Sequence, residues 1–164
     1  VIWYELSGGV GPWGALRPLA ALALSLIPFL YLDQIPDWVM PSVLPERMRT
    51  MAAILRDPNP VHWDPHVVEQ IGYGRHTINQ GPLGLSYMVN MLHAWAGHTS
   101  IRRIVMRFPY AVLDGDHITA KGEVLTVRND NGETLADCRI WLERPGTESP
   151  LEGTATVAIS NEGE

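Results

Sequence analysis

The sequence predicts an α+β fold in which an antiparallel sheet wraps around one long helix. Apolar residues recur at intervals of three and four within residues 81–97, the spacing of a helix with one buried face. Four later segments alternate apolar and polar residues instead, and short turn sequences separate them. A helix followed by closely connected strands indicates two layers, with neighbouring strands running in opposite directions.

Length and composition indicate one folded domain. The chain has 164 residues, of which 46% are hydrophobic, enough for one well-formed core and short for two. We assign this domain to residues 33–164 and treat residues 1–32 as an apolar N-terminal extension. Residues 18–32 are apolar but too short to span a bilayer comfortably, and no signal-peptide pattern accompanies them. Three interpretations stay open: a helix packed on the domain or a neighbouring subunit, an artefact of the chain start, and a membrane-directed segment.

Two short helices are predicted before the long one. Residues 45–55 carry apolar side chains at positions i, i+3, i+4 and i+7. A second helix is predicted over residues 65–71. Asp64 provides a cap for the free N–H groups of its first turn, Pro65 suits the first helical position, and Gly72 marks its end.

The long helix is predicted to begin at Gly81 and to end at Gly97. Tyr87, Met88 and Met91 lie on its apolar face, together with residues one turn before and after them. This is the strongest helical pattern in the chain, so we expect this helix to occupy the centre of the fold.

The predicted strands follow this helix. The alternating segments are residues 103–108, 118–127, 134–142 and 154–159. Residues 113–116 and 129–132 are rich in Asp, Asn and Gly, which favour tight reversals of the chain. A loop rich in Pro, Gly and Ser, residues 145–150, separates the last two strands. These connections make the strands antiparallel neighbours.

Charge and cysteine content exclude several classes of function. The net charge is −6 and the 12 basic residues form no long run, so nucleic acid is not an expected partner. Cys138 is the single cysteine, which excludes a disulfide framework and a cysteine-built zinc site. We therefore expect no metal and a reducing, cytoplasmic compartment, and we do not expect a membrane partner.

A short proline-rich segment carries the strongest candidate for catalysis. Asp57 and His62 lie close together in the sequence DPNPVH, where Pro58 and Pro60 restrict the backbone. A carboxylate and an imidazole held near each other can act as a general acid and base. Further along, the N–H of Gly81 at the start of the long helix could polarise a carbonyl group. Together these groups indicate proton chemistry beside an acyl group.

The same residues resemble a known family. The sequence DPNPVHWD at residues 57–64 resembles the hydratase-2 signature of MaoC-like (R)-specific enoyl-CoA hydratases and dehydratases. GRHTINQG at residues 74–81 stands where that family has a loop ending in glycine at the start of the hot-dog helix. RFPYAVLDGD at residues 107–116 is similar to its next strand and turn. The resemblance covers about residues 33–159 and implies the hot-dog fold.

The resemblance also implies a reaction. It predicts hydration of a trans-2-enoyl thioester to an (R)-3-hydroxyacyl thioester, or the reverse dehydration. Asp57 and His62 are then the catalytic acid/base pair, and the Gly81 N–H binds the thioester carbonyl. Asn59 and Ser86 are supporting residues. No cofactor is expected, because CoA or phosphopantetheine is part of the substrate.

The implied partners follow from the same family. We expect an acyl thioester as substrate, with an acyl carrier protein as the alternative carrier to CoA. Hot-dog proteins of this kind pair into dimers, so we expect a homodimer or a larger even oligomer. Candidates for binding the anionic part of the carrier are Arg75, Arg102, Arg103 and Arg107.

The sequence departs from the family pattern just before the long helix. Asn79 and Gln80 replace an Ala-His pair that is frequent there, and Pro82 replaces a common Met. Two other functions stay open, the first because of these departures and the second because it occurs on the same fold. One is a non-catalytic hot-dog subunit or acyl-binding module of a larger complex. The other is a thioesterase, which is the weaker alternative because residues 81–97 contain no Asp or Glu.

Overall fold

The computed structural model describes residues 34–159, so the predictions for the extension at residues 1–32 lie outside the described residues. The elements, in chain order, are β1 (Gln34–Met40), α2 (Pro45–Leu55), the 3-10 helix η1 (Pro60–His62), α3 (Pro65–Gln70), α4 (Gly81–Ala96), β2 (Ile101–Arg107), β3 (Ile118–Asp130), β4 (Glu133–Glu143) and β5 (Glu152–Ala158). The predicted α+β class is confirmed.

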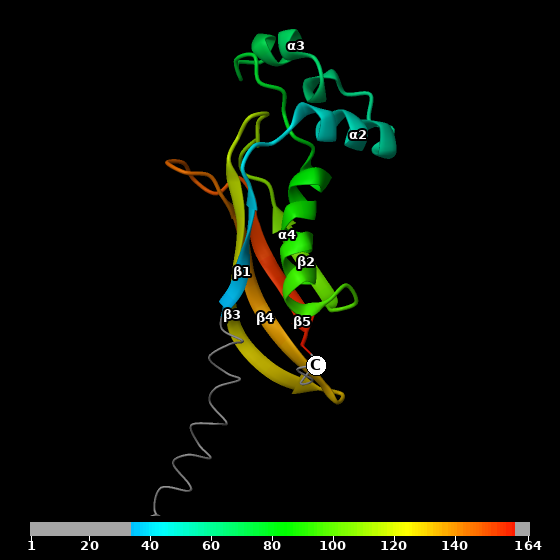
Figure 1. The fold of residues 1–164 in the computed structure, drawn as a ribbon, viewed down its shortest axis with the longest axis vertical. Coiled ribbons are helices and arrows are strands. Elements are labelled where there is room, and N and C mark those ends of the chain that lie inside the picture. Colours follow the sequence, from blue (N-terminus) through cyan, green and yellow to red (C-terminus); the bar gives the residue numbers. More distant parts are fainter. Residues whose placement is uncertain (1–33, 160–164) are drawn as a thin grey trace, which may run out of the picture. The chain divides into compact units, whose positions relative to one another are not determined.

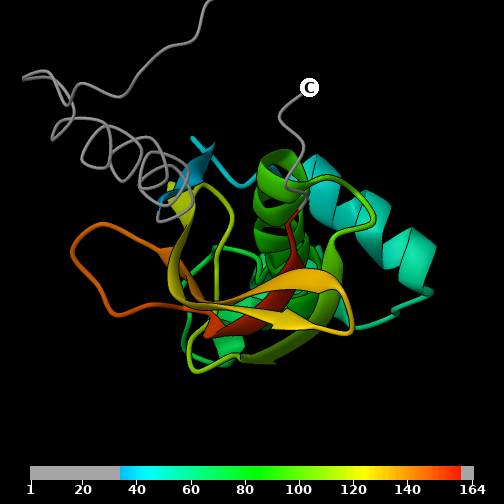
Figure 2. The same cartoon turned by 90° about the horizontal axis from the view of Figure 1, so that it is seen from below.

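The strands form one five-stranded sheet in the order β1-β3-β4-β5-β2, with every neighbouring pair antiparallel. Helix α4 contacts all five strands. It lies along one face of the sheet, and the sheet curves around it (Figures 1 and 2). The predicted arrangement of a sheet wrapped around a central helix is therefore confirmed.

The core lies between this face of the sheet and α4. Tyr87, Met88, Met91 and Leu92 are buried on the helix. On β4 the buried positions alternate through Ala136, Cys138, Ile140 and Leu142, the period of a strand with one covered face. The helical and strand periodicities read from the sequence thus meet in one apolar layer, which fixes the position of α4.

The predicted helices agree closely with the observed ones. Helix α2 has the predicted bounds, and α4 ends one residue before the predicted Gly97. The predicted cap of α3 is present, since the Asp64 carboxylate accepts a hydrogen bond of 2.9 Å from the His66 N–H. No helix within residues 34–159 is long and apolar enough to cross a membrane.

Strand β1 was missed by the sequence analysis. Pro36 and Asp37 interrupt its alternation, and its register with β3 shifts between Ile35 and Trp38. Proline is tolerated in a strand at such an irregularity or at a sheet edge, and β1 is an edge strand. Pro36 therefore hides the alternating pattern of β1 in the sequence, although a strand at the edge of the sheet can contain a proline.

Helices α2 and α3 lie beyond the end of the sheet at which α4 begins (Figure 1). The side-chain Nε2 of Gln80 donates a hydrogen bond of 2.8 Å to the Met48 carbonyl of α2. This bond joins α2 to the residue that precedes α4. The segment between α2 and α3 is thereby held near the first turn of the central helix.

The pairing of β5 with β2 depends on the absence of a side chain at Gly153. A Cβ at this position would lie 2.0 Å from the Val105 carbonyl oxygen. We expect Gly153→Ala to lower the free energy of unfolding by about 3 kcal/mol, because the two strands must separate to accommodate the methyl group. Urea unfolding followed by circular dichroism measures this change.

Thr154→Ala is the matched control for that substitution. Thr154 is the next residue on the same strand and is exposed, so its truncation should change the free energy of unfolding by less than about 0.5 kcal/mol. Equal stability of the Gly153→Ala variant and the unsubstituted protein would contradict the close approach of the two strands.

Candidate active site

The segment that carries Asp57 begins where α2 ends. Arg56 adopts a left-handed conformation (φ 53°, ψ 41°), and the next N–H, of Asp57, donates to the Ala52 carbonyl at 2.9 Å. The Asn59 N–H then donates to Asp57 Oδ1 at 3.0 Å. Asn59 Oδ1 in turn accepts from the Val61 N–H at 3.3 Å and caps η1. The backbone of this loop therefore orients the carboxylate.

The two predicted acid/base residues lie together. His62 Nε2 is 3.2 Å from Asp57 Oδ2. The His62 side chain is 11% exposed and that of Asp57 is 30% exposed, so the pair is largely shielded but reachable by a small molecule. Their convergence is the arrangement expected of a general acid/base pair.

The opposite ring nitrogen of His62 fixes which nitrogen can exchange a proton. His62 Nδ1 lies 2.6 Å from the Ile78 carbonyl oxygen. A carbonyl only accepts hydrogen bonds, so Nδ1 carries the hydrogen and donates it. Nε2 is the ring nitrogen that faces Asp57, and because a carboxylate oxygen and a bare ring nitrogen are both acceptors, a hydrogen bond between them requires one proton shared by the pair. Proton exchange by the imidazole is thus directed to the carboxylate side.

The segment before α4, residues 77–80, is hydrogen-bonded both to the loop that carries His62 and to the chain that follows β2. The Ile78 N–H donates to the Val61 carbonyl at 2.8 Å, and the Asn79 N–H donates to the Val112 carbonyl at 2.7 Å. Ile78 also forms an isolated antiparallel bridge with Leu113. One extended segment therefore connects the His62 loop, the turn after β2 and the start of α4.

A carboxylate outside the predicted set anchors this segment. Asp114 Oδ2 accepts hydrogen bonds from the Thr77 N–H at 2.9 Å and from the Thr77 hydroxyl at 2.7 Å. Asp114 Oδ1 accepts from His76 Nδ1, also at 2.7 Å. The sequence analysis recognised Asp114 only as a turn residue, because its partners lie far from it along the chain.

Gly81 is the first residue of α4. Gln80 precedes it in an extended conformation (φ −62°, ψ 142°). The Gly81 N–H has no hydrogen-bond partner among residues 34–159, as is usual for the first N–H groups of a helix. The Phe108 ring packs on Gly81, since a Cβ at this position would lie 3.3 Å from Phe108 Cε1. This N–H is a free donor at the positive end of the helix dipole.

A cavity of about 370 Å³ adjoins Gly81. Its wall includes Ile78, Asn79, Gln80, Phe108, Tyr110 and Leu151. Neither Asp57 nor His62 lines it, but the carbonyl of its wall residue Ile78 holds the His62 ring. The residue that orients the His62 ring is thus also part of the wall of the cavity beside Gly81.

The predicted supporting residues have different surroundings. Asn59 touches the carboxylate through its backbone N–H, whereas its side chain caps η1. The Ser86 hydroxyl donates to the Leu83 carbonyl of its own helix at 2.7 Å. The structure therefore gives Ser86 a local bond within α4 and no bond to Asp57.

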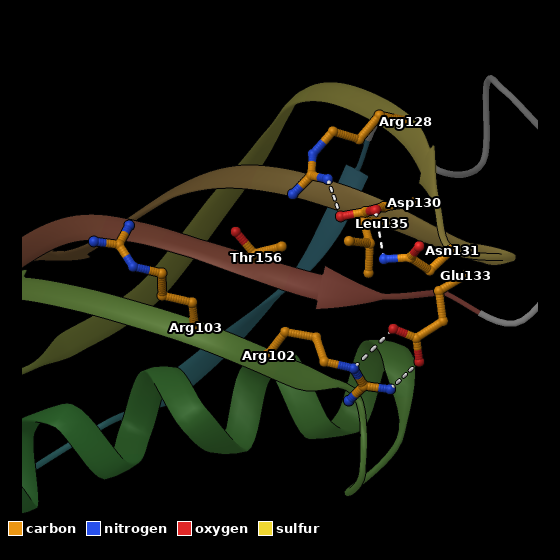
Figure 3. A pocket seen from close by; sticks show the side chains of 8 residues that line it. All are labelled: Arg102, Arg103, Arg128, Asp130, Asn131, Glu133, Leu135 and Thr156. Carbon is orange, nitrogen blue, oxygen red and sulfur yellow. Dashed lines mark hydrogen bonds and ion pairs between the residues drawn. The ribbon is translucent and has the colours of Figure 1, made fainter.

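A second pocket, of about 380 Å³, lies over β2, β3, β4 and β5 (Figure 3). Two of its arginines are paired: Arg102 bonds Glu133, and Arg128 contacts Asp130 at 3.1 Å. Arg103 has no ion-pair partner among the described residues, and its guanidinium points away from the two pairs (Figure 3). Of the candidate anion-binding arginines, Arg75 and Arg107 contact Glu69 and Glu152 at 3.9 and 2.6 Å.

Two other kinds of site are not formed in the described part of the chain. Within residues 34–159, no group of three or more His, Cys, Asp and Glu residues is arranged to hold a metal ion. Burial raises the pKa of the Cys138 thiol to about 12, and Asp137 adds to this effect. A thiol with this pKa stays protonated at neutral pH and is a poor nucleophile.

Comparison with known proteins identifies the family. The sequence matches the MaoC like domain over residues 33–137, which is more than half of the chain. The protein belongs to the MaoC-like dehydratase family. The predicted resemblance is confirmed, and the hot-dog fold with it. No curated protein matches the sequence.

Three solved structures resemble the fold. The R-hydratase PhaJ1 of Pseudomonas aeruginosa has a TM-score of 0.70 and 20% identity, covering 80% of this chain and 83% of its own. The (R)-hydratase of A. caviae involved in PHA biosynthesis has a TM-score of 0.67 and 25% identity, covering 79% and 98%. The ChsH1-ChsH2 complex of Mycobacterium tuberculosis has a TM-score of 0.66 and 19% identity, covering 78% and 98%.

The Asp114 anchor makes stability depend on pH. Burial alone would raise the pKa of this carboxyl, but the hydrogen bonds from Thr77 and His76 outweigh burial and lower it below 3.8. A lowered pKa in the folded state stabilises the protein above pH 3.8, and this contribution is lost as the pH falls further. We expect Asp114→Asn to lower the free energy of unfolding at pH 7 by about 1–3 kcal/mol.

The difference in the free energy of unfolding between the unsubstituted protein and Asp114→Asn should shrink as the pH falls from about 5 to about 3. Urea unfolding at several pH values measures it. Thr77→Val removes one donor to the same carboxylate and should reproduce part of the effect. A difference in stability that is constant over this pH range would show that Asp114 does not anchor the segment as an ionised group.

Proposed function

We propose that this protein is a hydratase or dehydratase that interconverts a trans-2-enoyl thioester and an (R)-3-hydroxyacyl thioester. The observation that carries the proposal is the 3.2 Å approach of His62 Nε2 to Asp57 Oδ2, with Nδ1 of the same ring bonded to Ile78. Membership of the MaoC-like dehydratase family and the similarity to a 25% identical (R)-hydratase support it.

In the hydration direction, a water molecule lies between the acid/base pair and the substrate. Asp57 and His62 remove a proton from this water as its oxygen bonds to Cβ of the enoyl group. The electrons of the double bond move toward the thioester, and the developing enolate oxygen accepts a hydrogen bond from the Gly81 N–H. The pair then returns a proton to Cα, which completes the addition of one water molecule. Dehydration follows the same steps in reverse.

The proposed reaction needs only proton transfer and stabilisation of a negative oxygen. CoA or phosphopantetheine takes part as the carrier of the acyl group, and an acyl carrier protein is the alternative source of that arm. Arg103 is the candidate in this set that has no ion-pair partner among residues 34–159, so it is the first to consider for binding an anionic carrier. We place the reaction in the cytoplasm.

The proposed assembly is a homodimer or a larger even oligomer. Strand β2 is an edge of the sheet, so one side of its backbone lacks a neighbouring strand. Val105 on this strand is 45% exposed and Phe108 just beyond it is 48% exposed. Pairing of two copies at this edge would cover both residues.

The roles of the acid/base pair can be tested by substitution. We expect Asp57→Asn and His62→Gln each to lower kcat for hydration of crotonyl-CoA by about 10²–10⁴-fold, because each removes a group that transfers the proton. The measurement is the loss of the enoyl absorbance, with circular dichroism to confirm folding. Release of free thiol is followed in parallel.

Asp64→Asn is the matched control, because Asp64 belongs to the same motif but its side chain bonds only the His66 N–H among residues 34–159. Asn is an equally good helix cap, so this variant should retain activity within about twofold. Full activity of Asp57→Asn would remove Asp57 from the mechanism. Thiol release without hydration would favour a thioesterase, and no reaction with any enoyl thioester would favour an acyl-binding module.

The role of the Gly81 N–H can be tested by deleting that single group. Gly81→Pro removes the N–H at a helical position where proline is well tolerated, and the extended Gln80 is compatible with a following proline. We expect a loss in kcat of about 10²–10³-fold. Gly81→Ala keeps the N–H and adds a Cβ near Phe108, so it controls for the added bulk. Equal kcat values for the two variants would rule out this N–H as the carbonyl donor.

A further inference from the structure

The residue before Ile78 lies where an exposed loop meets the candidate site. The Ile78 carbonyl accepts a hydrogen bond from His62 Nδ1 at 2.6 Å and so orients the imidazole. Residues 71–76 are all exposed, whereas Thr77 is only 4% exposed. Exposed segments with few buried contacts are the parts of a fold that open most readily. Thr77 therefore separates such a segment from the residue that holds His62.

Three hydrogen bonds connect Thr77 to Asp114. The Asp114 N–H donates to the Thr77 carbonyl at 2.9 Å. Asp114 Oδ2 accepts from the Thr77 N–H at 2.9 Å and from the Thr77 hydroxyl at 2.7 Å. The other carboxylate oxygen, Oδ1, accepts from His76 Nδ1 at 2.7 Å. One carboxylate thus holds the last exposed residue of the loop and the first buried residue after it, through charge-assisted bonds.

Asp114 lies in a turn that is itself held in place. The Gly115 N–H donates to the Val43 carbonyl at 2.9 Å, and the Val43 N–H donates to the Asp116 carbonyl, also at 2.9 Å. The Asp116 carboxylate accepts a further bond of 2.9 Å from Arg144. The turn is therefore a fixed support, relative to which the carboxylate of Asp114 holds the neighbouring segment.

Three successive peptide units lead from this support to the imidazole. The first ends in the Thr77 N–H, which is bonded to the carboxylate, and the second contains the Thr77 carbonyl, which is bonded to the Asp114 N–H. The third contains the Ile78 carbonyl that accepts from His62. Each peptide unit is planar, so a rotation at Thr77 changes the direction of the units that follow it. The position of Thr77 therefore affects the direction of the Ile78 carbonyl.

We propose that Thr77 and Asp114 form a positioning pair, which acts through the Ile78 carbonyl to hold the His62 ring in the orientation that proton transfer requires. The inference rests on the proposed function and gives this pair an effect on turnover, beyond its effect on stability. Neither Thr77 nor Asp114 lines the cavity beside Gly81. The pair should therefore affect the chemical step and not the binding of the thioester.

Kinetics of two variants at one position test this role. Thr77→Val removes the hydroxyl and keeps the shape of the side chain. We expect it to lower kcat for crotonyl-CoA hydration by about tenfold or more, because proton transfer is sensitive to small displacements, with KM changed by less than about twofold. Thr77→Ser keeps the hydroxyl and should retain kcat within about threefold. Equal kcat values for the two variants, or a raised KM with unchanged kcat, would contradict the positioning role.

Nitrogen NMR of protein with isotope-labelled histidine observes the ring directly. The chemical shifts of the two ring nitrogens report which of them carries a hydrogen, and the His62 signals are those that His62→Gln removes. The unsubstituted protein should show a protonated Nδ1, because this atom donates to Ile78. Thr77→Val should shift the Nδ1 signal toward that of an unprotonated nitrogen. Asp114→Asn should change it in the same direction, and gives a reading if Thr77→Val does not fold.

Ser100→Ala is the matched control for the loss of a buried hydroxyl. Ser100 is also 4% exposed, and its hydroxyl donates at 2.6 Å to the carbonyl of Gly97, at the opposite end of α4 from Gly81. This variant should keep kcat within about twofold and leave the His62 signals unchanged. A loss of kcat equal to that of Thr77→Val would contradict a specific role for Thr77.

The two measurements separate this inference from the proposed function. Hydration by the unsubstituted protein together with unchanged His62 signals in Thr77→Val would overturn the positioning role alone. Changed signals, without hydration of any enoyl thioester by the unsubstituted protein, would overturn the proposed reaction and leave the pair as the support of the imidazole. Unchanged signals without hydration would overturn both.

Discussion

The site depends on the two backbone hydrogen bonds of Ile78. Its N–H binds the Val61 carbonyl, and its carbonyl binds the ring of the next residue, His62. The first bond sets the distance between the loop and the segment before α4, and the second sets the orientation of the imidazole. Because Ile78 is three residues before Gly81, the same segment that holds the acid/base pair also leads to the free N–H of the helix.

Most of the fold could be predicted from the sequence because its elements have strong local patterns. The apolar face of α4 and the alternation in β4 are properties of short stretches of chain, and burial against each other preserves both. Strand β1 could not be predicted in the same way, since Pro36 breaks its pattern and only the edge position explains why a strand forms there. Register and strand order depend on pairs that are distant in sequence.

The candidate site was predictable only in part for a similar reason. The proline-braced spacing of Asp57 and His62 is visible in the sequence, as is the glycine that begins α4. The carbonyl of Ile78 gives no sequence signal, because every residue has one. Asp114 is separated by 37 residues from Thr77, and nothing local to either residue indicates that they meet. Contacts of backbone groups and of distant side chains require the folded structure.

The left-handed turn at Arg56 and the bonds that follow it restrict how the length of this chain can vary. Asp57 and His62 are separated by a fixed number of peptide units, which are held by the side-chain hydrogen bonds of Asp57 and Asn59 and by η1. An insertion between them would move the carboxylate away from the imidazole. The exposed hairpin that connects β3 and β4 has no such constraint, so related chains can lengthen or shorten there while the geometry of the site is preserved.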